Sequence, residues 1–412
     1  MEKFRKKWKR NRNGITLVAL VITIIILLIL AGIAIASLTG DNGLFARANQ
    51  ARQNTIDAQN KENATLEGYE DLIDIYAEGA ATAGTVNDAK LESKRYAQTT
   101  TIKDDLNNDV VIPMGFKVSS DSATIVEDGV VIEDKNGNQF VWIPAKTGEG
   151  AELKLSNGKT VTIKYERLAY GSNIATGTND DKTNSEIINY SNSSNNFFIE
   201  EMPIDEVSSI NRNGGYYIGR YESGDKESTL IKEMRNEDSS QNNTVTIQKN
   251  QVPYNYITFN NLKKLAEQMD TSNGYATATT KLVSSYAWDT AISFIQKVND
   301  GNEHSDYATN SIDGNYKNTE FTYTNLSGNQ QTKNTGDETV VLTGQTKEVC
   351  NIYDLGGNLW EYTTEICSNI NAPYTDRGGC YGNEFNIEPA GYRSRSAGTA
   401  YISDGFRVTL YI

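Results

Sequence analysis

The hydrophobic and polar positions of this chain fall into three successive patterns. The first is an unbroken apolar run over residues 15–38, with no charged side chain and only Thr16, Thr23 and Ser37 as hydroxyl-bearing residues. As a helix at 1.5 Å per residue, this run would extend roughly 36 Å, which exceeds a hydrocarbon core of about 30 Å. The pattern predicts a transmembrane helix over 15–38 that follows a basic leader at 1–14.

The second pattern is helical. After Gly40-Asp41-Asn42-Gly43, apolar residues recur every three or four positions, first at Leu44, Ala48, Ala51, Thr55 and Ala58 and then at Leu66, Tyr69, Leu72, Ile73 and Tyr76. This spacing predicts an amphipathic helix over 39–79. The polar segment 80–109 then reads as a linker to the remainder of the chain.

The third pattern, over 110–412, alternates strand signals with turn signals. Asn136-Gly137 lies between two apolar runs, which predicts a hairpin with a two-residue turn. The run 213–224 reads as another strand. Apolar stripes predict amphipathic helices over 256–269 and 285–298. Two segments, 170–196 and 298–336, have little periodicity and read as long surface loops.

Charge is distributed unevenly along the chain. The net charge is −14, although seven of the first fourteen residues are Lys or Arg, so the remainder is strongly acidic. An acidic body excludes nucleic acid as a partner, because phosphate binding requires clustered basic side chains. The basic leader predicts a cytoplasmic N-terminus, with the C-terminal head outside the cell. The three cysteines, Cys350, Cys367 and Cys380, are too few for a disulfide scaffold.

The junction between leader and apolar run is Gly14 followed by Ile15-Thr16-Leu17. It resembles the leader of type IV pilins and pseudopilins. The resemblance implies that a prepilin peptidase cleaves between Gly14 and Ile15 and that the new N-terminus is methylated. It also implies other pilin-like subunits as partners in a fibre. Ala19 departs from the family, which usually has Glu at that position, so filament assembly stays open. A cleaved signal peptide and a plain membrane anchor are the alternatives.

The C-terminal third carries an ordered set of motifs. "NIYDLGGNLWEYTTE" at 351–365 is followed by "RGGCYGN" at 377–383 and "GFRVTLYI" at 405–412, and "GGYYIGRYESG" and "WDTAISFI" lie upstream. This set resembles the formylglycine-generating-enzyme and sulfatase-modifying-factor family over 110–412. The resemblance implies an α+β fold of the C-type-lectin type, with a mixed, loop-rich head after the N-terminal transmembrane helix.

The enzymes of that family use a pair of reactive cysteines. Counted from the Gly378-Gly379 turn, the matching positions hold Asn383 and Ile387, while Cys380 replaces the serine of the turn. One thiol cannot supply a site with two thiolates. His304, the single histidine, leaves no Ser-His-Asp triad and no zinc site. We therefore expect no catalytic residues and no enzymatic activity.

The resemblance also implies a calcium site at the "GGNLWE" turn. Its ligands would be the side chains of Asp354 and Glu361 and the carbonyl oxygens of Gly357 and Leu359. Calcium prefers hard oxygen ligands of this kind. The alternative is a glycine turn that Asp354 caps without a metal.

The predicted function is display of a lectin-type domain that binds an extracellular carbohydrate or protein in adhesion. Aromatic and hydrogen-bonding side chains in 381–395 suit such a contact surface, namely Tyr381, Asn383, Phe385, Asn386, Tyr392 and Arg393. The alternatives are a formylglycine-generating type of enzyme and a structural minor pseudopilin. The ligand, the oligomeric state and any diversification of the C-terminal region by a retroelement stay open.

Overall fold

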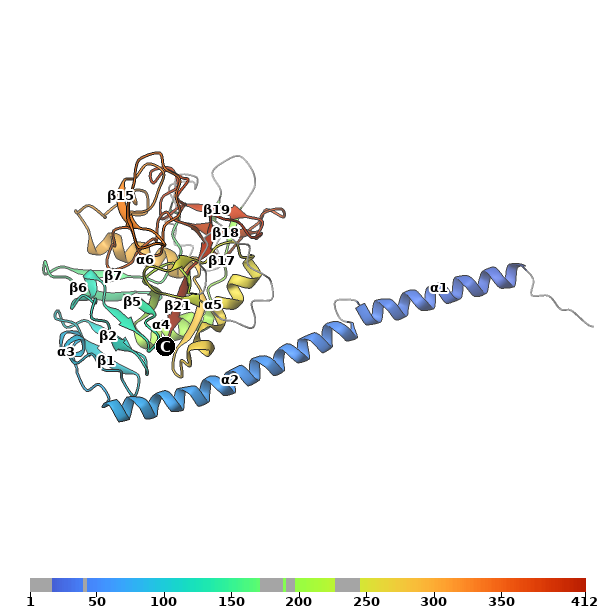
Figure 1. Ribbon diagram of the computed structural model, residues 1–412, viewed down its shortest axis with the longest axis horizontal. Helices are drawn as coiled ribbons and strands as arrows, with labels where there is room; N and C mark the ends of the chain where they lie inside the picture. The colour runs from blue at the N-terminus through green and yellow to red at the C-terminus, as the bar shows by residue number, and fades with distance from the viewer. Residues whose placement is uncertain (1–16, 40–42, 171–187, 190–196, 227–244) are drawn as a thin grey trace, which may run out of the picture. The chain divides into compact units, whose positions relative to one another are not determined.

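The computed structural model describes residues 17–39, 43–170, 188–189, 197–226 and 245–412 (Figure 1). The chain forms two compact units, Met1–Glu62 and Asn63–Ile412. The predicted cleavage between Gly14 and Ile15 lies outside the described residues.

Two helices begin in the first unit, α1 (Leu17–Thr39) and α2 (Leu44–Glu78). Among the residues that the model describes, none of the helices has both the length and the apolar character needed to cross a membrane. By this finding the expected transmembrane helix over 15–38 is wrong, and so is the expected placement as a single-pass membrane protein.

The second unit is built on two six-stranded sheets. The first is antiparallel throughout, in the order β14-β21-β10-β5-β4-β3. Its strands are β3 (Lys117–Val118), β4 (Val131–Glu133), β5 (Gln139–Pro144), β10 (Gly215–Gly219), β14 (Thr279–Leu282) and β21 (Val408–Tyr411). The C-terminal strand β21 therefore lies inside this sheet, between β14 and β10.

The second sheet has the order β19-β18-β17-β9-β8, and β20 pairs in parallel with the first half of β17. Its strands are β8 (Ile188–Asn189), β9 (Phe197–Ile199), β17 (Trp360–Cys367), β18 (Tyr374–Arg377), β19 (Arg393–Ser396) and β20 (Asp404–Phe406). Most of the C-terminal motif residues lie on this sheet or in the turns beside it.

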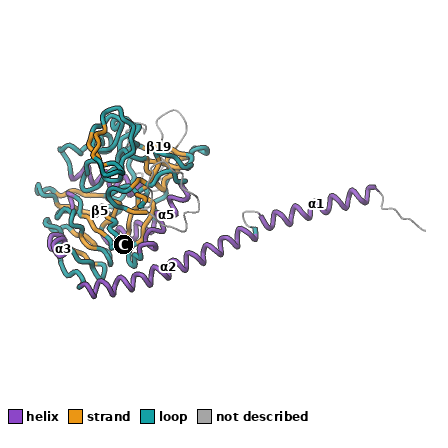
Figure 2. The backbone as a smooth tube through the Cα atoms, viewed as in Figure 1, coloured by secondary structure: helices purple, strands orange, loops and turns teal. Residues whose placement is uncertain are grey.

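Small sheets and hairpins complete the unit. They are the sheet β12-β11-β13 (Val245–Thr246, Gly224–Asp225, Val252–Pro253) and the pairs β1-β2 (Thr100–Lys103, Asp109–Ile112), β6-β7 (Ala151–Lys154, Thr160–Ile163) and β15-β16 (Phe321–Thr324, Gln330–Lys333). A short 3₁₀ helix covers Val126–Asp128. The β15-β16 hairpin lies in the segment 298–336, which was expected to be loop throughout. Loops also surround the strands near β19 (Figure 2).

Four helices pack in the second unit: α3 (Val86–Glu92), α4 (Ile204–Asn213), α5 (Phe259–Asn273) and α6 (Ser285–Val298). The predicted helices over 256–269 and 285–298 are confirmed as α5 and α6. Ser284 caps α6 by accepting a hydrogen bond from the backbone N–H of Ala287. The segment 80–109, which was expected as a polar linker, contains α3 and β1 and buries Val86 and Tyr96 in the core.

The hairpin predicted at Asn136-Gly137 is confirmed as β4-β5, but its turn differs. The strands end at Glu133 and resume at Gln139, so the loop covers 134–138. Only Gly137 has a positive φ in this loop. Asp134 Oδ1 accepts hydrogen bonds from the backbone N–H groups of Asn136 and Asn138, at 2.8 and 2.7 Å. A side chain therefore closes this turn, which the dipeptide signal did not predict.

Candidate functional site

The "GGNLWE" turn leads into β17 and contains a strained backbone. Asp354 and Asn358 have φ of 54° and 58°, and Gly357 has φ of 79°. A Cβ atom at Gly357 would lie 2.5 Å from the carbonyl oxygen of Asn315, so only glycine fits there. Asp354 accepts from the N–H of Gly344 and from the hydroxyl of Thr346, both at 2.7 Å. This carboxylate therefore ties the turn to the segment before it.

Glu361, the second expected calcium ligand, forms a buried ion pair. Its two oxygens accept from Nε and Nη2 of Arg407 at 2.8 and 2.6 Å, and both side chains are inaccessible to solvent. Burial raises the pKa of Glu361 to about 7, and the Arg407 guanidinium keeps it from rising further. The guanidinium also donates to the carbonyls of Gly219 and Tyr353. Arg407 thus joins β17 to the loop after β10.

The turn does not fit a calcium ion as it is arranged. Both oxygens of Glu361 accept hydrogen bonds from Arg407, and both oxygens of Asp354 accept from Gly344 and Thr346. Within the described part of the chain, no group of three or more His, Cys, Asp or Glu could hold a metal ion. Glu361 would have to leave Arg407 before it could bind calcium.

We therefore expect the melting temperature of the protein to be the same in calcium and in chelator. A ligand that binds only the folded state would add about 2.7 kcal/mol at 100 times its Kd, which a melting curve detects readily. A rise in melting temperature with calcium that disappears in the Asp354→Asn variant would reinstate the calcium site.

The Gly378-Gly379 turn places Cys380 inside the protein. Burial raises the pKa of the Cys380 thiol to about 12, so the thiol is protonated at neutral pH. Asn383 closes this turn, since its Oδ1 accepts from the N–H of Cys380 at 2.8 Å. Ile387 is 53% exposed. The two positions that match the family's cysteine pair thus hold a turn-closing amide and an exposed aliphatic side chain.

The other two cysteines are also free thiols in this structure. Burial raises the pKa of Cys350 to about 12, and burial also raises the pKa of Cys367. Protonated thiols are poor nucleophiles and poor metal ligands. At Cys367 the effect of burial outweighs the attraction of Arg395, so the pKa of this thiol is raised as well.

The structure separates the residues that were expected to contact a ligand. Five of them keep side-chain surface, namely Tyr381, Asn383, Phe385, Asn386 and Tyr392. Arg393 is fully buried instead: its Nη1 donates to the carbonyl of Leu168 at 2.8 Å and its Nε to Glu365 Oε2 at 2.9 Å. Arg393 is therefore part of the interior and not of a contact surface.

Arg393 belongs to a buried network of charges that the sequence did not reveal. Glu365 binds both Arg393 and Arg167, and Asp289 binds both Arg393 and Arg377, the latter at 2.6 Å. Burial alone would raise the pKa of Glu365, but the attraction of Arg393 and Arg167 outweighs burial and lowers this pKa to about 2. The network joins α6, β17, β18 and β19 beneath the second sheet.

The opposite face of this sheet carries a second set of side chains. The register pairs Tyr362 with Asp376 and Trp360 with Asp404, so these four side chains share one face. The Tyr362 hydroxyl donates to Asp404 Oδ2 at 3.1 Å, and Ser403 donates to Asp404 Oδ1 at 3.0 Å. Asp376 Oδ1 is buried and has no hydrogen-bond partner among the described residues.

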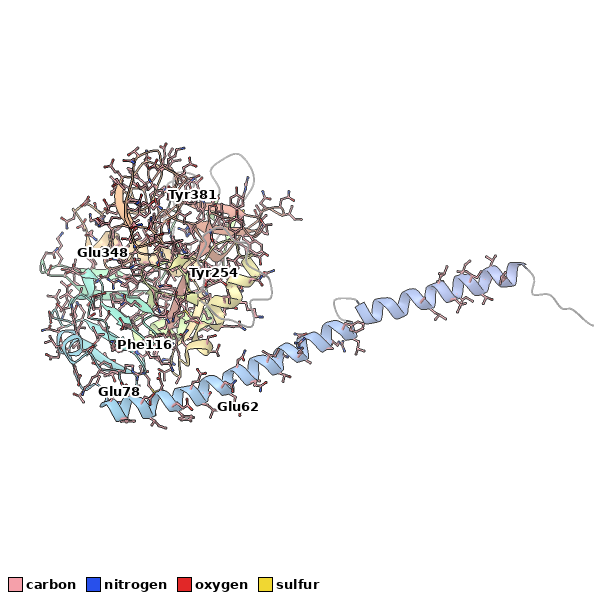
Figure 3. The ribbon with its side chains drawn as sticks, in the orientation of Figure 1. Glu62, Glu78, Phe116, Tyr254, Glu348 and Tyr381 are labelled. Carbon is pink, nitrogen blue, oxygen red and sulfur yellow. The ribbon has the colours of Figure 1, made fainter. Side chains whose placement is uncertain are left out.

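Aromatic rings lie beside this carboxylate pair. Trp360 contacts Tyr392 with ring centroids 5.9 Å apart, and the N–H of Trp360 donates to the carbonyl of Ser403. The N–H of Tyr256 donates to the carbonyl of Tyr401, and burial together with neighbouring acidic groups raises the pKa of Tyr381. We call this set the aromatic face, and Figure 3 labels one of its members, Tyr381. Its residues are Tyr256, Trp360, Tyr381, Tyr392 and Tyr401.

The carboxylate pair predicts a specific pH dependence. Burial raises the pKa of Asp376 well above its usual value and Asp404 raises it further, while burial also raises the pKa of Asp404. Because these pKa values are raised, the folded chain keeps protons on the two carboxyl groups at pH values where the unfolded chain has lost them. The stability that the protonated pair contributes is therefore complete below the unfolded pKa of about 3.9 and declines as pH rises above it. We expect the urea midpoint of the wild type to fall more between pH 4 and pH 8 than that of Asp376→Asn. Equal decreases of the urea midpoint in the two proteins would contradict the raised pKa of Asp376 beside Asp404.

Comparison with solved structures finds distant similarities. CarF shares 14% identity, with 48% of this chain and 87% of that chain covered and a TM-score of 0.28. Treponema denticola variable protein 1 shares 12% identity, with 63% of this chain and 98% of that chain covered and a TM-score of 0.32. PvdO from Pseudomonas aeruginosa shares 11% identity, with 68% of this chain and 98% of that chain covered and a TM-score of 0.35.

A search of curated proteins finds no match. The model of the family described as "Sulfatase-modifying factor enzyme 1-like domain" matches residues 151–412. The expected resemblance is thereby confirmed over this range, whereas nothing in these comparisons supports the pilin-like leader. The chain belongs to the FGE-sulfatase family of sulfatase-modifying factor enzyme 1-like domains.

Proposed function

We propose that this chain is a non-catalytic member of its family that binds a carbohydrate or protein ligand through the aromatic face. The observation that carries the proposal is that Trp360 shares one face of the second sheet with Asp376 and Asp404, and that its ring contacts Tyr392 beside the sheet. Tyr and Trp provide large, rigid contact areas with a polar tip, which suits recognition of either class of ligand.

The chemistry of the thiols supports binding over catalysis. A formylglycine-generating reaction in this family requires a reactive cysteine pair, whereas Cys380 is buried and protonated and Asn383 serves to close a turn. Asp376 Oδ1, which accepts no hydrogen bond from the described residues, provides an acceptor for a hydroxyl or N–H group of a ligand. The face therefore offers recognition without an evident reacting group.

The test is binding of the purified full chain to glycan and protein arrays, followed by variants of the aromatic face. We expect Tyr392→Ala and Tyr381→Ala each to weaken binding about thirtyfold or more, as truncation of an anchor residue costs about 2 kcal/mol or more. Tyr323→Ala on β15 is the matched control and should bind as the wild type does. Unchanged binding in both face variants would overturn the assignment of the site.

Enzymatic activity of the formylglycine-generating type is the second candidate, favoured only by membership of the family. We expect no aldehyde when the protein is incubated with copper and a cysteine-containing sulfatase peptide, since the thiols are held in their protonated form. The measurement is mass spectrometry of the peptide. Turnover that Cys380→Ser abolishes would make Cys380 catalytic and replace the binding proposal.

A further inference from the structure

The second half of α2 carries large apolar side chains that the rest of its unit does not cover. Leu66, Tyr69, Ile73 and Tyr76 are 57%, 62%, 67% and 67% exposed. Their spacing of three, four and three residues places them along one side of the helix. Ile75, which is 2% exposed, points to the other side and packs in the unit. We call the four exposed residues the apolar stripe.

An acidic border runs along the apolar stripe. Glu67, Glu70 and Asp74 are exposed, and none of them forms an ion pair with the described residues. Contiguous exposed apolar surface with a polar rim marks an interaction site more often than isolated exposed residues do. The charges of the border select the partner, since a second acidic surface would be repelled and a basic one attracted.

The first half of the same helix has the complementary chemistry. Arg47 and Arg52 are exposed there, and so are Leu44 and Phe45, at 64% and 59%, together with Ile56 at 38%. We call residues 44–56 the basic segment. Because α2 is one continuous helix of 35 residues, its basic segment cannot fold back onto its own apolar stripe. A contact between the two requires two copies of the chain.

We propose that the apolar stripe of α2 binds the basic segment of α2 from a second copy of this chain. Phenylalanine and isoleucine of one helix then cover leucine, isoleucine and tyrosine of the other, while Arg52, which lies on the same side of the helix as Phe45 and Ile56, meets the acidic border. In an antiparallel pair, each copy offers both surfaces to the other, so the contact is made twice and closes into an isologous dimer. In a parallel, staggered arrangement the contact is heterologous and continues from copy to copy.

Photocrosslinking of the full chain identifies the occupant directly. A benzophenone amino acid replaces Tyr69 in one copy, which is mixed with isotope-labelled protein and irradiated. We expect covalent pairs in which the label-bearing peptide comes from residues 44–56. Adducts confined to other segments, or no covalent pair at micromolar concentration, would overturn the proposal.

Charge reversal provides an independent test. The variants R47E/R52E and E67K/E70K should each weaken self-association in sedimentation experiments about tenfold, and a 1:1 mixture of the two should associate as tightly as the wild type because the charges are again opposite. Recovery in the mixture also rules out misfolding as the cause of the loss. E152K, which reverses an exposed charge on β6, should behave as the wild type. The proposed contact would be contradicted if self-association were lost in the variants and not recovered in their mixture, or if it were not lost at all.

Discussion

Replacement of Arg393 by methionine is expected to lower the free energy of unfolding by about 3–5 kcal/mol. Arg393 is the only side chain of the described network that binds both Glu365 and Asp289. Methionine fills a similar volume but leaves two buried carboxylates short of a counter-charge, and an uncompensated buried charge costs more than the pair contributes. Urea unfolding at neutral pH measures the effect.

A surface ion pair provides the matched control. Lys103 binds Asp109 at 2.6 Å, but the two side chains are 44% and 60% exposed. Lys103→Met should therefore cost at most about 1 kcal/mol. If Arg393→Met costs no more than Lys103→Met, then the network beneath the second sheet does not stabilise the fold, and its charges are neutralised in another way.

Local sequence patterns predicted the helices of the second unit well, because each depends on residues close together in the chain. The stripe of apolar residues around Trp288 predicted α6, and the capping Ser284 agrees with its start. The ordered motifs around Trp360 and Gly378 predicted the family that the match over 151–412 confirms. In both cases the information is contained within about fifteen residues.

The buried charges could not be predicted in this way, since their partners are far apart in the sequence. Asp289 and Arg393 are separated by 104 residues, and Glu361 and Arg407 by 46. Arginine is rarely buried unless it is paired, so Arg393 in a polar run was interpreted as a surface residue. Only the register of β18 and β19 places its side chain on the inner face of the sheet.

The expected calcium site stays a prediction, although its carboxylates are engaged by other groups of the protein. The motif correctly located Asp354 and Glu361 in one buried region, but a motif does not report what else approaches these carboxylates. Arg407 comes from the last motif of the chain and occupies both oxygens of Glu361. Likewise, the Asp376–Asp404 pair depends on two strands that meet only across β17, so no spacing along the chain indicated it.

The Glu361–Arg407 pair gives the second large prediction. Glu361→Gln keeps the volume but leaves a buried guanidinium without its counter-charge, so we expect a loss of about 3–5 kcal/mol in the free energy of unfolding. Arg407→Met should cost a similar amount by leaving Glu361 unpaired. Glu384→Gln, at an exposed position, is the control and should stay within about 0.5 kcal/mol of the wild type.

The double variant Glu361→Gln with Arg407→Met tests whether the pair itself causes these losses. With both charges removed, no uncompensated charge is left in the interior, so the double variant should be more stable than the sum of the two single losses implies, by about 0.5–3 kcal/mol. Strict additivity would mean that the two side chains act independently. In that case the bonds from Arg407 to the carbonyls of Gly219 and Tyr353 would account for its contribution.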